Sequence, residues 1–274
     1  SHDNTVEICR DWVDRNKDRF VDSTIITTPV NTGTAGNVNR ALSVTKGEWV
    51  KILAGDDVLI EDAISSYVEF VSNDSTIQAT FAEAIHFRGA ITDKQFTFEK
   101  IDLEKLTLNE KITAKRQYDI LKKMFFGSGP TFFVKKKIFD EVGGFDERFP
   151  LHDDYPFFIK ITRAGYKIHL LKKRLVYKRV CESSVQYKQH SNALLKNLTV
   201  ICVRDYKYKY KMENLNLLWR FFLKFSLLLQ MRVINAGNTK QSLRCRIYYY
   251  QQRILDPFVW YDRYMHWLDK VYNI

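Results

Sequence analysis

The chain has 274 residues, which is enough for one large domain or two of ordinary size. Hydrophobic residues make up 45% of it and charged residues 27%, and this balance excludes a largely disordered chain. The cysteines show neither the pairing of a disulfide framework nor the spacing of a zinc ribbon, so they fit a reducing compartment. They are Cys9, Cys181, Cys202 and Cys245.

The charge is divided unevenly along the chain, whose formal net charge is +11. Residues 170–274 contain 20 Lys and Arg against 6 Asp and Glu, giving +14. Residues 1–169 contain 23 against 26, giving −3. A near-neutral part suits a catalytic body, whereas a basic part suits an anionic surface such as lipid headgroups, nucleic acid or a phosphorylated substrate.

The first 87 residues alternate helical and strand-like patterns. N-cap chemistry at residues 3–5 predicts a helix through about residue 19. Strands are expected at 20–28, 49–54 and 77–87, and helices at 37–46 and 61–72. Strands that alternate with helices predict a parallel, three-layer α/β body.

The second half begins with a polar stretch, 88–125, where we expect a long helix that carries Lys and Glu. A tight Gly-Ser-Gly-Pro loop at 127–130 then precedes a strand. Next come helices at 138–142 and 154–164, each followed by glycine, and a strand at 168–177. From residue 186 onward the pattern predicts long helices.

Three segments carry side chains suited to chemistry, and the first is Gly55-Asp56-Asp57. It follows a nearly all-apolar strand, and ligands of open α/β sheets bind at the carboxyl ends of strands. Adjacent carboxylates repel each other unless a cation offsets them, and Mg²⁺ or Mn²⁺ held together with phosphate oxygens would do so. The alternative is an Asp-rich turn that starts the next helix.

The second segment lies at a strand-to-helix junction. Its glycines, Gly33 and Gly36, permit close approach of the backbone, and the N–H groups of a helix N-terminus favour anions. The asparagines Asn31, Asn37 and Asn39 could read a base or a ribose. The alternative is ordinary turn and capping chemistry.

The third segment runs Gly-Gly-Phe-Asp-Glu at 143–147 and is followed by Asp153 and Asp154 at the start of a helix. A carboxylate near a helix N-terminus has its ionised form favoured. An ionised carboxylate can accept a proton from an attacking hydroxyl. The alternative is an N-cap without a chemical role.

In their order and spacing, these segments resemble the inverting family 2 glycosyltransferases, which have the GT-A fold that binds nucleotide-diphospho-sugars. The resemblance covers about residues 1–185. No single motif is specific, but several in the right order are strong together. The matching segments are 1–5, 31–33 with 39–41, 46–50 leading to 53–57, 143–147, 153–154 and 163–167.

The resemblance implies a direct displacement at the anomeric carbon of a nucleotide-diphosphate sugar, with uridine diphosphate as the expected carrier. Asp154 resembles the general base, with Asp153 as the second choice, and Asp57 with Asp56 resembles the family's metal and diphosphate element. Mn²⁺ or Mg²⁺ would stabilise the leaving diphosphate. The acceptor would be a saccharide or a lipid-linked saccharide in surface-polysaccharide or lipopolysaccharide assembly. The expected donor-binding residues are Asp3, Asn31, Gly33, Asn37, Asn39, Gly55 and Asp56.

Three departures from the family pattern stand out. The family's first strand, first helix and second strand would precede Ser1. The first carboxylate of the family's D-x-D motif falls on Ala54. Cys181 replaces the histidine of an Arg-x-His-x-x-Ser segment, and a hard cation prefers oxygen ligands to a thiolate.

Residues 186–274 are expected to form a basic, aromatic-rich helical extension of a 1–185 catalytic domain. In 215–231 a wide apolar face carries a narrow polar stripe, which suits an anionic membrane interface. The alternative is that these helices pack on the catalytic body. No apolar run reaches the roughly 18 residues of a membrane span. We therefore expect a cytoplasmic protein, peripheral on the inner face of the cell membrane.

Two other functions remain open at this point. The departures from the family pattern would also fit a non-catalytic, nucleotide-sugar-binding or membrane-attached scaffold. The basic part could bind nucleic acid, but it carries no recognition motif, so we expect no nucleic-acid partner.

Overall fold

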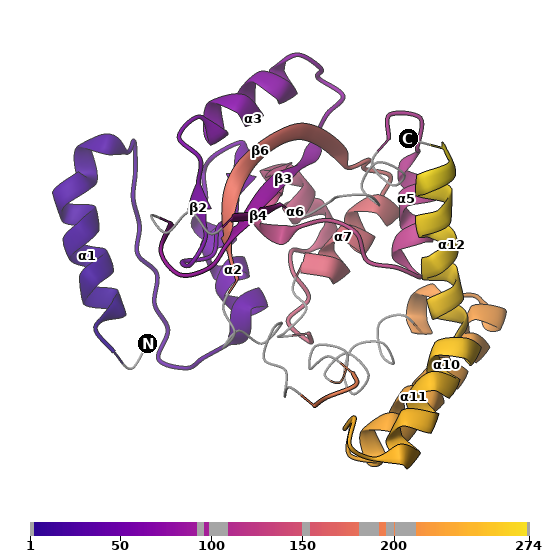
Figure 1. The fold of residues 1–274 in the computed structure, drawn as a ribbon. Coiled ribbons are helices and arrows are strands. Elements are labelled where there is room, and N and C mark those ends of the chain that lie inside the picture. Colours follow the sequence, from indigo (N-terminus) through magenta and orange to yellow (C-terminus); the bar gives the residue numbers. More distant parts are fainter. Residues whose placement is uncertain are drawn as a thin grey trace.

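The computed structural model centres on one mixed β-sheet (Figure 1). Its strands lie in the order β1-β5-β3-β6-β2, with β4 beside β3. They are β1 Trp49–Lys51, β2 Val58–Leu59, β3 Ala79–Phe87, β4 Phe96–Phe98, β5 Phe133–Lys135 and β6 His169–Arg179. The structure describes residues 3–91, 96–98, 109–149, 154–180, 192–195, 200 and 212–272.

The prediction of a parallel sheet is wrong for most of the described strands. Long strands β3 and β6 are parallel, from the pair Thr80 and His169 to the pair Phe87 and Arg179. The β1–β5, β5–β3, β3–β4 and β2–β6 pairs are all antiparallel. Strands of two or three residues carry no periodic signal, so the sequence does not reveal the direction in which they enter the sheet.

The predicted helices are confirmed, with ends shifted by a few residues. The expected long helix within 88–125 is reduced, in the described part, to a helix of eight residues. The other described residues of that stretch form β4, turns and irregular backbone. The helices of this part are α1 Thr5–Asn16, α2 Gly33–Val44, α3 Ala63–Ser72, α5 Ala114–Leu121, α6 Lys136–Val142 and α7 Asp154–Arg163.

The predicted strand at 20–28 is wrong. The segment pairs with none of the described strands, and Val21 is fully exposed. A run of β-branched residues favours extended backbone, but a strand forms only where a neighbour completes its hydrogen bonds. The expected strands at 49–54, 77–87 and 168–177 are confirmed as β1, β3 and β6.

The core lies on both faces of the sheet, as a three-layer body requires. On one face, Phe81 of β3 packs with Phe157 and Phe158 of α7 and with residues of α5 and α6. On the other face, Ala82 packs with Tyr67 of α3 and with residues of β6. Since successive side chains of a strand point to opposite faces, β3 supplies both cores.

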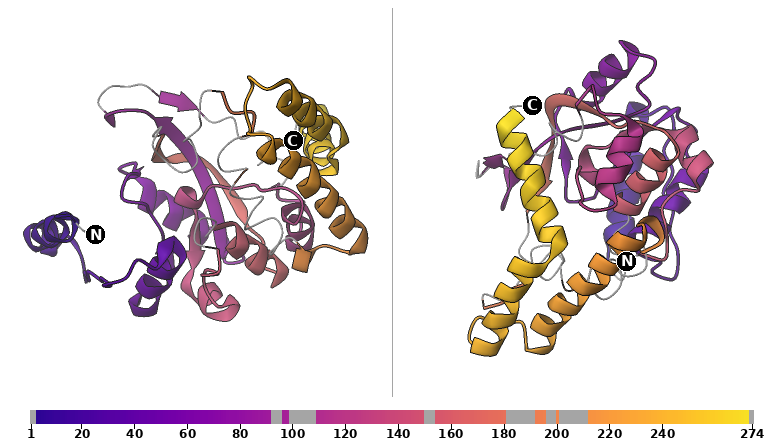
Figure 2. Two further views of the ribbon diagram at one scale, coloured as in Figure 1. Left: turned by 90° about the horizontal axis from the view of Figure 1, so that it is seen from below. Right: turned by 90° about the vertical axis from the view of Figure 1, so that its right-hand side faces the viewer.

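The C-terminal helices α10 Leu217–Asn235, α11 Leu243–Leu255 and α12 Pro257–Tyr272 extend from one side of the body (Figure 2). Leu223 and Leu227 of α10 are buried in a core shared with Phe258. Met265 of α12 belongs to the core of the body, so α12 ties the extension to the sheet layer. None of the helices in the described ranges is long and apolar enough to cross a bilayer.

Candidate functional site

Asp57 lies in a turn between β1 and β2, beside the carboxyl end of β6. Its backbone N–H donates to the Ala54 carbonyl at 3.1 Å and closes this turn. Val58 pairs with Tyr177, so Asp57 comes opposite the last residues of β6. The Arg179 backbone N–H donates to Asp57 Oδ1 at 3.0 Å. Only 8% of Asp57 is exposed, whereas Gly55 and Asp56 are exposed.

The Asp57 carboxylate is buried with few compensating contacts. Burial raises its pKa above the usual value, and the neighbouring Asp56 charge raises it further. The Arg179 N–H and the charges of Lys178 and Lys51 act in the opposite direction. Oδ2 receives no hydrogen bond from the described residues. This oxygen is therefore available to a cation or to a hydrogen-bond donor.

Arg179 is held against the same turn. Its Nε donates to the Asp56 carbonyl at 3.3 Å, and its guanidinium also donates to the Gly89 carbonyl. The guanidinium lies 4.5 Å from the centre of the Phe87 ring. A guanidinium fixed in this way suits the recognition of phosphate oxygens.

Lys51, the last residue of β1, contacts a second loop. Its Nζ donates to the Ile52 carbonyl at 2.8 Å and to the Pro130 carbonyl. Burial lowers the pKa of Lys51 to about 8, and the Asp57 charge opposes this shift. A lysine inside an otherwise apolar strand is thereby placed between two polar segments.

Asp154 begins α7 and lies next to the same loop. A Cβ built on Gly129 would come within 2.9 Å of Asp154 Oδ2, so the carboxylate packs against this glycine. Ser128 Oγ is buried and makes no hydrogen bond with the described residues. Lys51 and Asp154 therefore both contact the 128–130 loop, Lys51 through the Pro130 carbonyl and Asp154 through Gly129. Asp153 lies outside the described residues.

The asparagines near α2 form local and long-range contacts of their own. Asn31 Oδ1 accepts from the Gly33 N–H at 2.9 Å, and Asn37 Oδ1 accepts from Arg40 at 3.2 Å. Asn39 reaches the 143–147 segment. Its Nδ2 donates to the Phe145 carbonyl and to Glu147, and its Oδ1 accepts from the Phe145 N–H at 2.8 Å.

Asn39 explains why residue 144 is a glycine. Gly144 has a φ of +64°, and a Cβ there would come within 2.7 Å of Asn39 Oδ1. The second and third motifs of the sequence are thus joined by direct contact. No described contact joins this group to Asp57.

Asp3 is placed apart from the other predicted residues. Its Oδ1 accepts from the backbone N–H and the hydroxyl of Thr5, the first residue of α1. Helix α1 buries none of its residues and stands away from the sheet (Figure 1). A role for Asp3 in donor binding stays a prediction.

The fit of a metal ion can be judged from Asp56 and Asp57. Among the described residues, no three His, Cys, Asp or Glu side chains lie close enough to hold a metal ion alone. Mg²⁺ is usually bound by one or two carboxylates together with water and substrate phosphates. Two adjacent carboxylates, one with a spare oxygen, fit an ion that a diphosphate also ligates.

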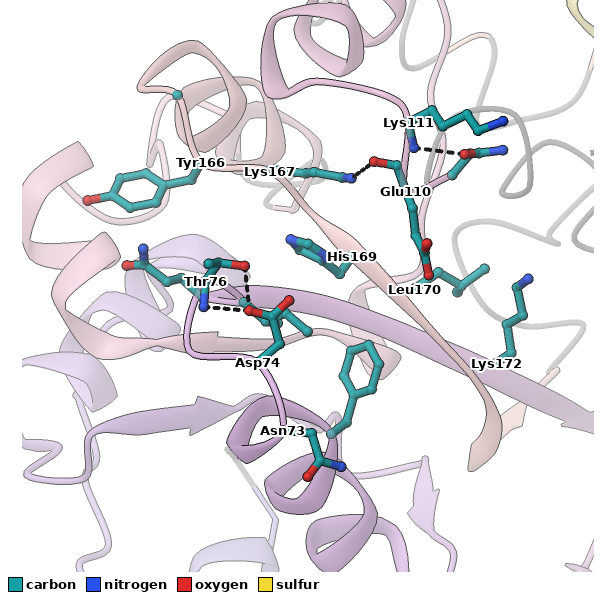
Figure 3. A pocket seen from close by; sticks show the side chains of 15 residues that line it. Asn73, Asp74, Thr76, Glu110, Lys111, Tyr166, Lys167, His169, Leu170 and Lys172 are labelled. Atoms are coloured by element: carbon teal, nitrogen blue, oxygen red, sulfur yellow. Dashed lines mark hydrogen bonds between the residues drawn. The ribbon is translucent and has the colours of Figure 1, made fainter.

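A large cavity of about 1080 Å³ lies elsewhere (Figure 3). Asp74, Lys167 and His169 line it, and Lys167 Nζ donates to the Glu110 carbonyl at 2.5 Å. His169 begins β6 and Arg179 ends it, so the cavity lies on the order of 30 Å from Asp57 along the strand. None of the predicted site residues lines this cavity.

Sequence reasoning missed Lys51, Ser128 and Arg179 as candidate site residues. The signal for Lys51 is a charged side chain within a predicted buried strand. Arg179 stands at the end of a predicted strand, where ligands of α/β sheets bind. No sequence signal identifies Ser128, because its burial depends on the packing of its loop.

A family model described as glycosyl transferase family 2 matches residues 1–143, just over half of the chain. The chain belongs to glycosyl transferase family 2. An uncharacterized glycosyltransferase of Methanocaldococcus jannaschii is 24% identical over 154 residues, which are 55% of this chain and 48% of that protein. Another, from Haemophilus influenzae, is 23% identical over 150 residues, 53% of this chain and 48% of that protein. The chain thus spans about half the length of the curated relatives it matches.

Among solved structures, that of S. aureus TarS 1-349 in complex with UDP-GlcNAc is similar, with a TM-score of 0.57. The similarity covers 98% of this chain and 77% of that one at 14% identity, so it concerns the fold alone. The family 2 match and this structural likeness confirm the expected GT-A fold.

Proposed function

We propose that this family 2 member transfers a sugar from a nucleotide diphosphate, with uridine diphosphate as the carrier, to an acceptor hydroxyl with inversion. Two carboxylates carry the proposal: Asp57, whose Oδ2 receives no hydrogen bond from the described residues, and Asp154, which packs against Gly129 at the start of α7. The first is suited to the donor and the second to the acceptor.

The donor side consists of Asp56, Asp57, Lys178 and Arg179. The two carboxylates would hold Mn²⁺ or Mg²⁺, which supplies charge stabilisation as the diphosphate leaves. Arg179 is already fixed by the Asp56 and Gly89 carbonyls, so little side-chain entropy is lost when it binds a phosphate. The complex of TarS with UDP-GlcNAc supports a uridine diphosphate carrier.

The acceptor side centres on Asp154, with Asp153 as the second choice for the same role. As general base, the Asp154 carboxylate removes the proton from an acceptor hydroxyl. The hydroxyl oxygen then forms a bond to the anomeric carbon while the bond to the diphosphate oxygen breaks on the opposite face.

The acceptor is a saccharide or a lipid-linked saccharide in the assembly of surface polysaccharide or lipopolysaccharide. We place the protein in the cytoplasm, peripheral on the inner face of the cell membrane. Residues 1–185 form the catalytic domain and 186–274 the helical extension in this proposal. The basic charge of 170–274, with 20 cationic against 6 anionic side chains, supports contact with an anionic surface.

The test measures release of uridine diphosphate from a panel of donor sugars with Mn²⁺, Mg²⁺ or a chelator. Asp57→Ala and Asp154→Asn should each abolish metal-dependent release, whereas Asp74→Asn, in the remote cavity, should not. Full activity in both site variants would overturn the assignment. Binding of uridine diphosphate by calorimetry without any turnover would instead support the scaffold alternative.

A further inference from the structure

Helix α11 carries an apolar stripe on the side that faces away from the protein. Leu243, Ile247, Tyr250 and Ile254 follow one another at intervals of four, three and four residues, and they are 48–65% exposed. At about 3.6 residues per turn, this stripe lies opposite the buried face of the helix. That face contains Cys245 and Gln252.

Helix α12 repeats the arrangement. Trp260, Tyr264, Trp267 and Val271 have the same spacing and are 52–55% exposed. Met265 belongs to the core of the body, so this helix uses a different side for packing. Two successive helices therefore each present four large apolar or aromatic side chains to solvent.

The two stripes meet at the junction of the helices. The Trp260 indole N–H donates to the Ile254 carbonyl, which joins the last residue of one stripe to the first of the other. Figure 2 shows α11 and α12 running end to end along one side of the molecule in its right-hand view.

A buried carboxylate fixes this junction. Asp256, between the two helices, is 0% exposed. Its Oδ2 accepts from Ser226 Oγ, Gln230 Nε2 and Gln252 Nε2, and its Oδ1 accepts from the Phe258 N–H. Since these donors come from α10, α11 and α12, the orientation of α12 relative to α11 is fixed at this junction.

The charge bordering the stripes is positive. Helix α11 contains Arg244, Arg246 and Arg253 and no acidic residue. By helical spacing, Arg246 and Arg253 border one side of the stripe and Arg244 the other. Residues 217–272 contain nine Lys and Arg against three Asp and Glu, one of which is the buried Asp256.

We propose that the combined α11–α12 stripe is the surface through which the protein docks on an anionic lipid bilayer. Tryptophan and tyrosine favour the membrane–water interface, and arginines beside an apolar stripe attract anionic headgroups. A second copy of the chain would bring a surface of the same sign onto this one. The proposal names the surface responsible for the membrane location given under the proposed function. It rests on that location and not on the proposed sugar transfer.

The surface is tested by flotation of the full chain with phosphatidylcholine vesicles, with and without phosphatidylglycerol, in the absence of donor sugar. Ile247→Ser with Trp267→Ser should weaken binding at least tenfold. Ile64→Ser with Val68→Ser, which removes two comparably exposed residues of α3, should leave binding unchanged. Melting curves show that each variant is folded.

Charge is tested with Arg246→Gln and Arg253→Gln together. At about 1 kcal/mol per cation, the pair should weaken binding to phosphatidylglycerol vesicles roughly 25-fold and leave binding to pure phosphatidylcholine unchanged. No binding by the wild type, or an equal loss in the α3 variant, would overturn the proposal. A wild-type dimer that Ile247→Ser with Trp267→Ser dissociates, without vesicle binding, would assign the surface to a second copy.

Sugar transfer to a soluble acceptor separates the two proposals. The stripe variant should keep this activity without vesicles, since the stripe contributes no residue to the candidate site. Loss of vesicle binding with retained sugar transfer would leave the proposed catalytic function intact. Vesicle binding by a wild type that transfers no sugar would leave the docking surface intact.

Discussion

Asp57 in the sheet body and Asp256 in the helical extension are both buried carboxylates, with 8% and 0% of their surfaces exposed. Asp256 accepts four hydrogen bonds, from three side chains and one backbone N–H. Asp57 accepts one, from the Arg179 backbone, and leaves Oδ2 without a donor among the described residues.

The difference separates a structural carboxylate from a candidate ligand-binding one. Burying a carboxylate is unfavourable unless hydrogen bonds or charges compensate, and Asp256 is compensated by its own surroundings. Asp57 is compensated only in part, by one backbone hydrogen bond and nearby lysine charges, and burial raises its pKa. A buried group left in this condition beside cations is a candidate for binding a ligand that completes its contacts.

The largest expected effect is on catalysis. Asp57→Asn keeps the shape of the side chain and its hydrogen bond to Arg179, but it removes the charge that would hold a cation. We expect the rate of nucleotide release to fall about a thousandfold, or about 4 kcal/mol, with the free energy of unfolding unchanged or slightly higher. A rate within threefold of wild type would place Asp57 in the same structural class as Asp256.

The pH dependence of stability sharpens the description of the Asp57 side. The pKa of Lys51 is about 8 in the folded protein against an ordinary 10.5, so between these pH values the unfolded chain binds more protons. Stability therefore rises with pH across this window, by up to about 3 kcal/mol. Measured by urea unfolding, the free energy of unfolding of the wild type should rise across this window. That of Lys51→Met should lack this rise.

Lys46→Met is the matched control for this pH experiment, because Lys46 is exposed and pairs with Asp22 on the surface. Its stability should follow the wild-type curve. Parallel curves for wild type and Lys51→Met would show that Lys51 keeps an ordinary titration, and its link to the 128–130 loop would then need another explanation.

The third prediction concerns Asp256. In Asp256→Asn, an amide N–H₂ would face donors that now point to a carboxylate oxygen, and the negative charge would be lost. We expect the free energy of unfolding to fall by about 2 to 3 kcal/mol, measured with urea, while nucleotide release per folded molecule is unchanged. A loss of activity with unchanged stability would instead assign Asp256 a role in the reaction and not in the stability of the fold.

The smallest effect is stabilisation by metal. With uridine diphosphate present and Mn²⁺ at ten times its Kd, the wild type should gain about 1.4 kcal/mol, which raises the Tm by about 3 to 6 °C. Asp256→Asn should show the same rise from a lower starting Tm, whereas Asp57→Asn should show none. An equal rise in both variants would place the cation elsewhere.

Much of the fold could be predicted from the sequence, because caps and periodicity are local signals. They located α3, β3 and α7 within a few residues. The direction of the strands and the lack of strand pairing at 20–28 could not be predicted, because both depend on which segment lies beside the strand in the fold. A strand of two residues such as β2 has too few side chains for an alternation to be visible.

The candidate site shows the same division. Asp57 and Asp154 could be identified by their places at a strand end and a helix start. Lys51 could not be assigned a partner, because it donates to the backbone carbonyl of Pro130. Every residue has such a carbonyl, so the residue type does not show which one accepts a hydrogen bond. Asn39 was predicted to bind the donor, but its amide is engaged with the 143–147 segment, and its role with a donor stays a prediction.

The packing of Met265 into the core of the body has a consequence for any reaction carried out at a surface. A domain tethered by a flexible linker samples many tilts and heights, and its reach is set by the length of the linker. Here α12 is packed against the body through Met265. A protein that binds a membrane through this helix would therefore hold its body in one orientation. The height at which it meets an acceptor would then be fixed by the shape of the fold itself.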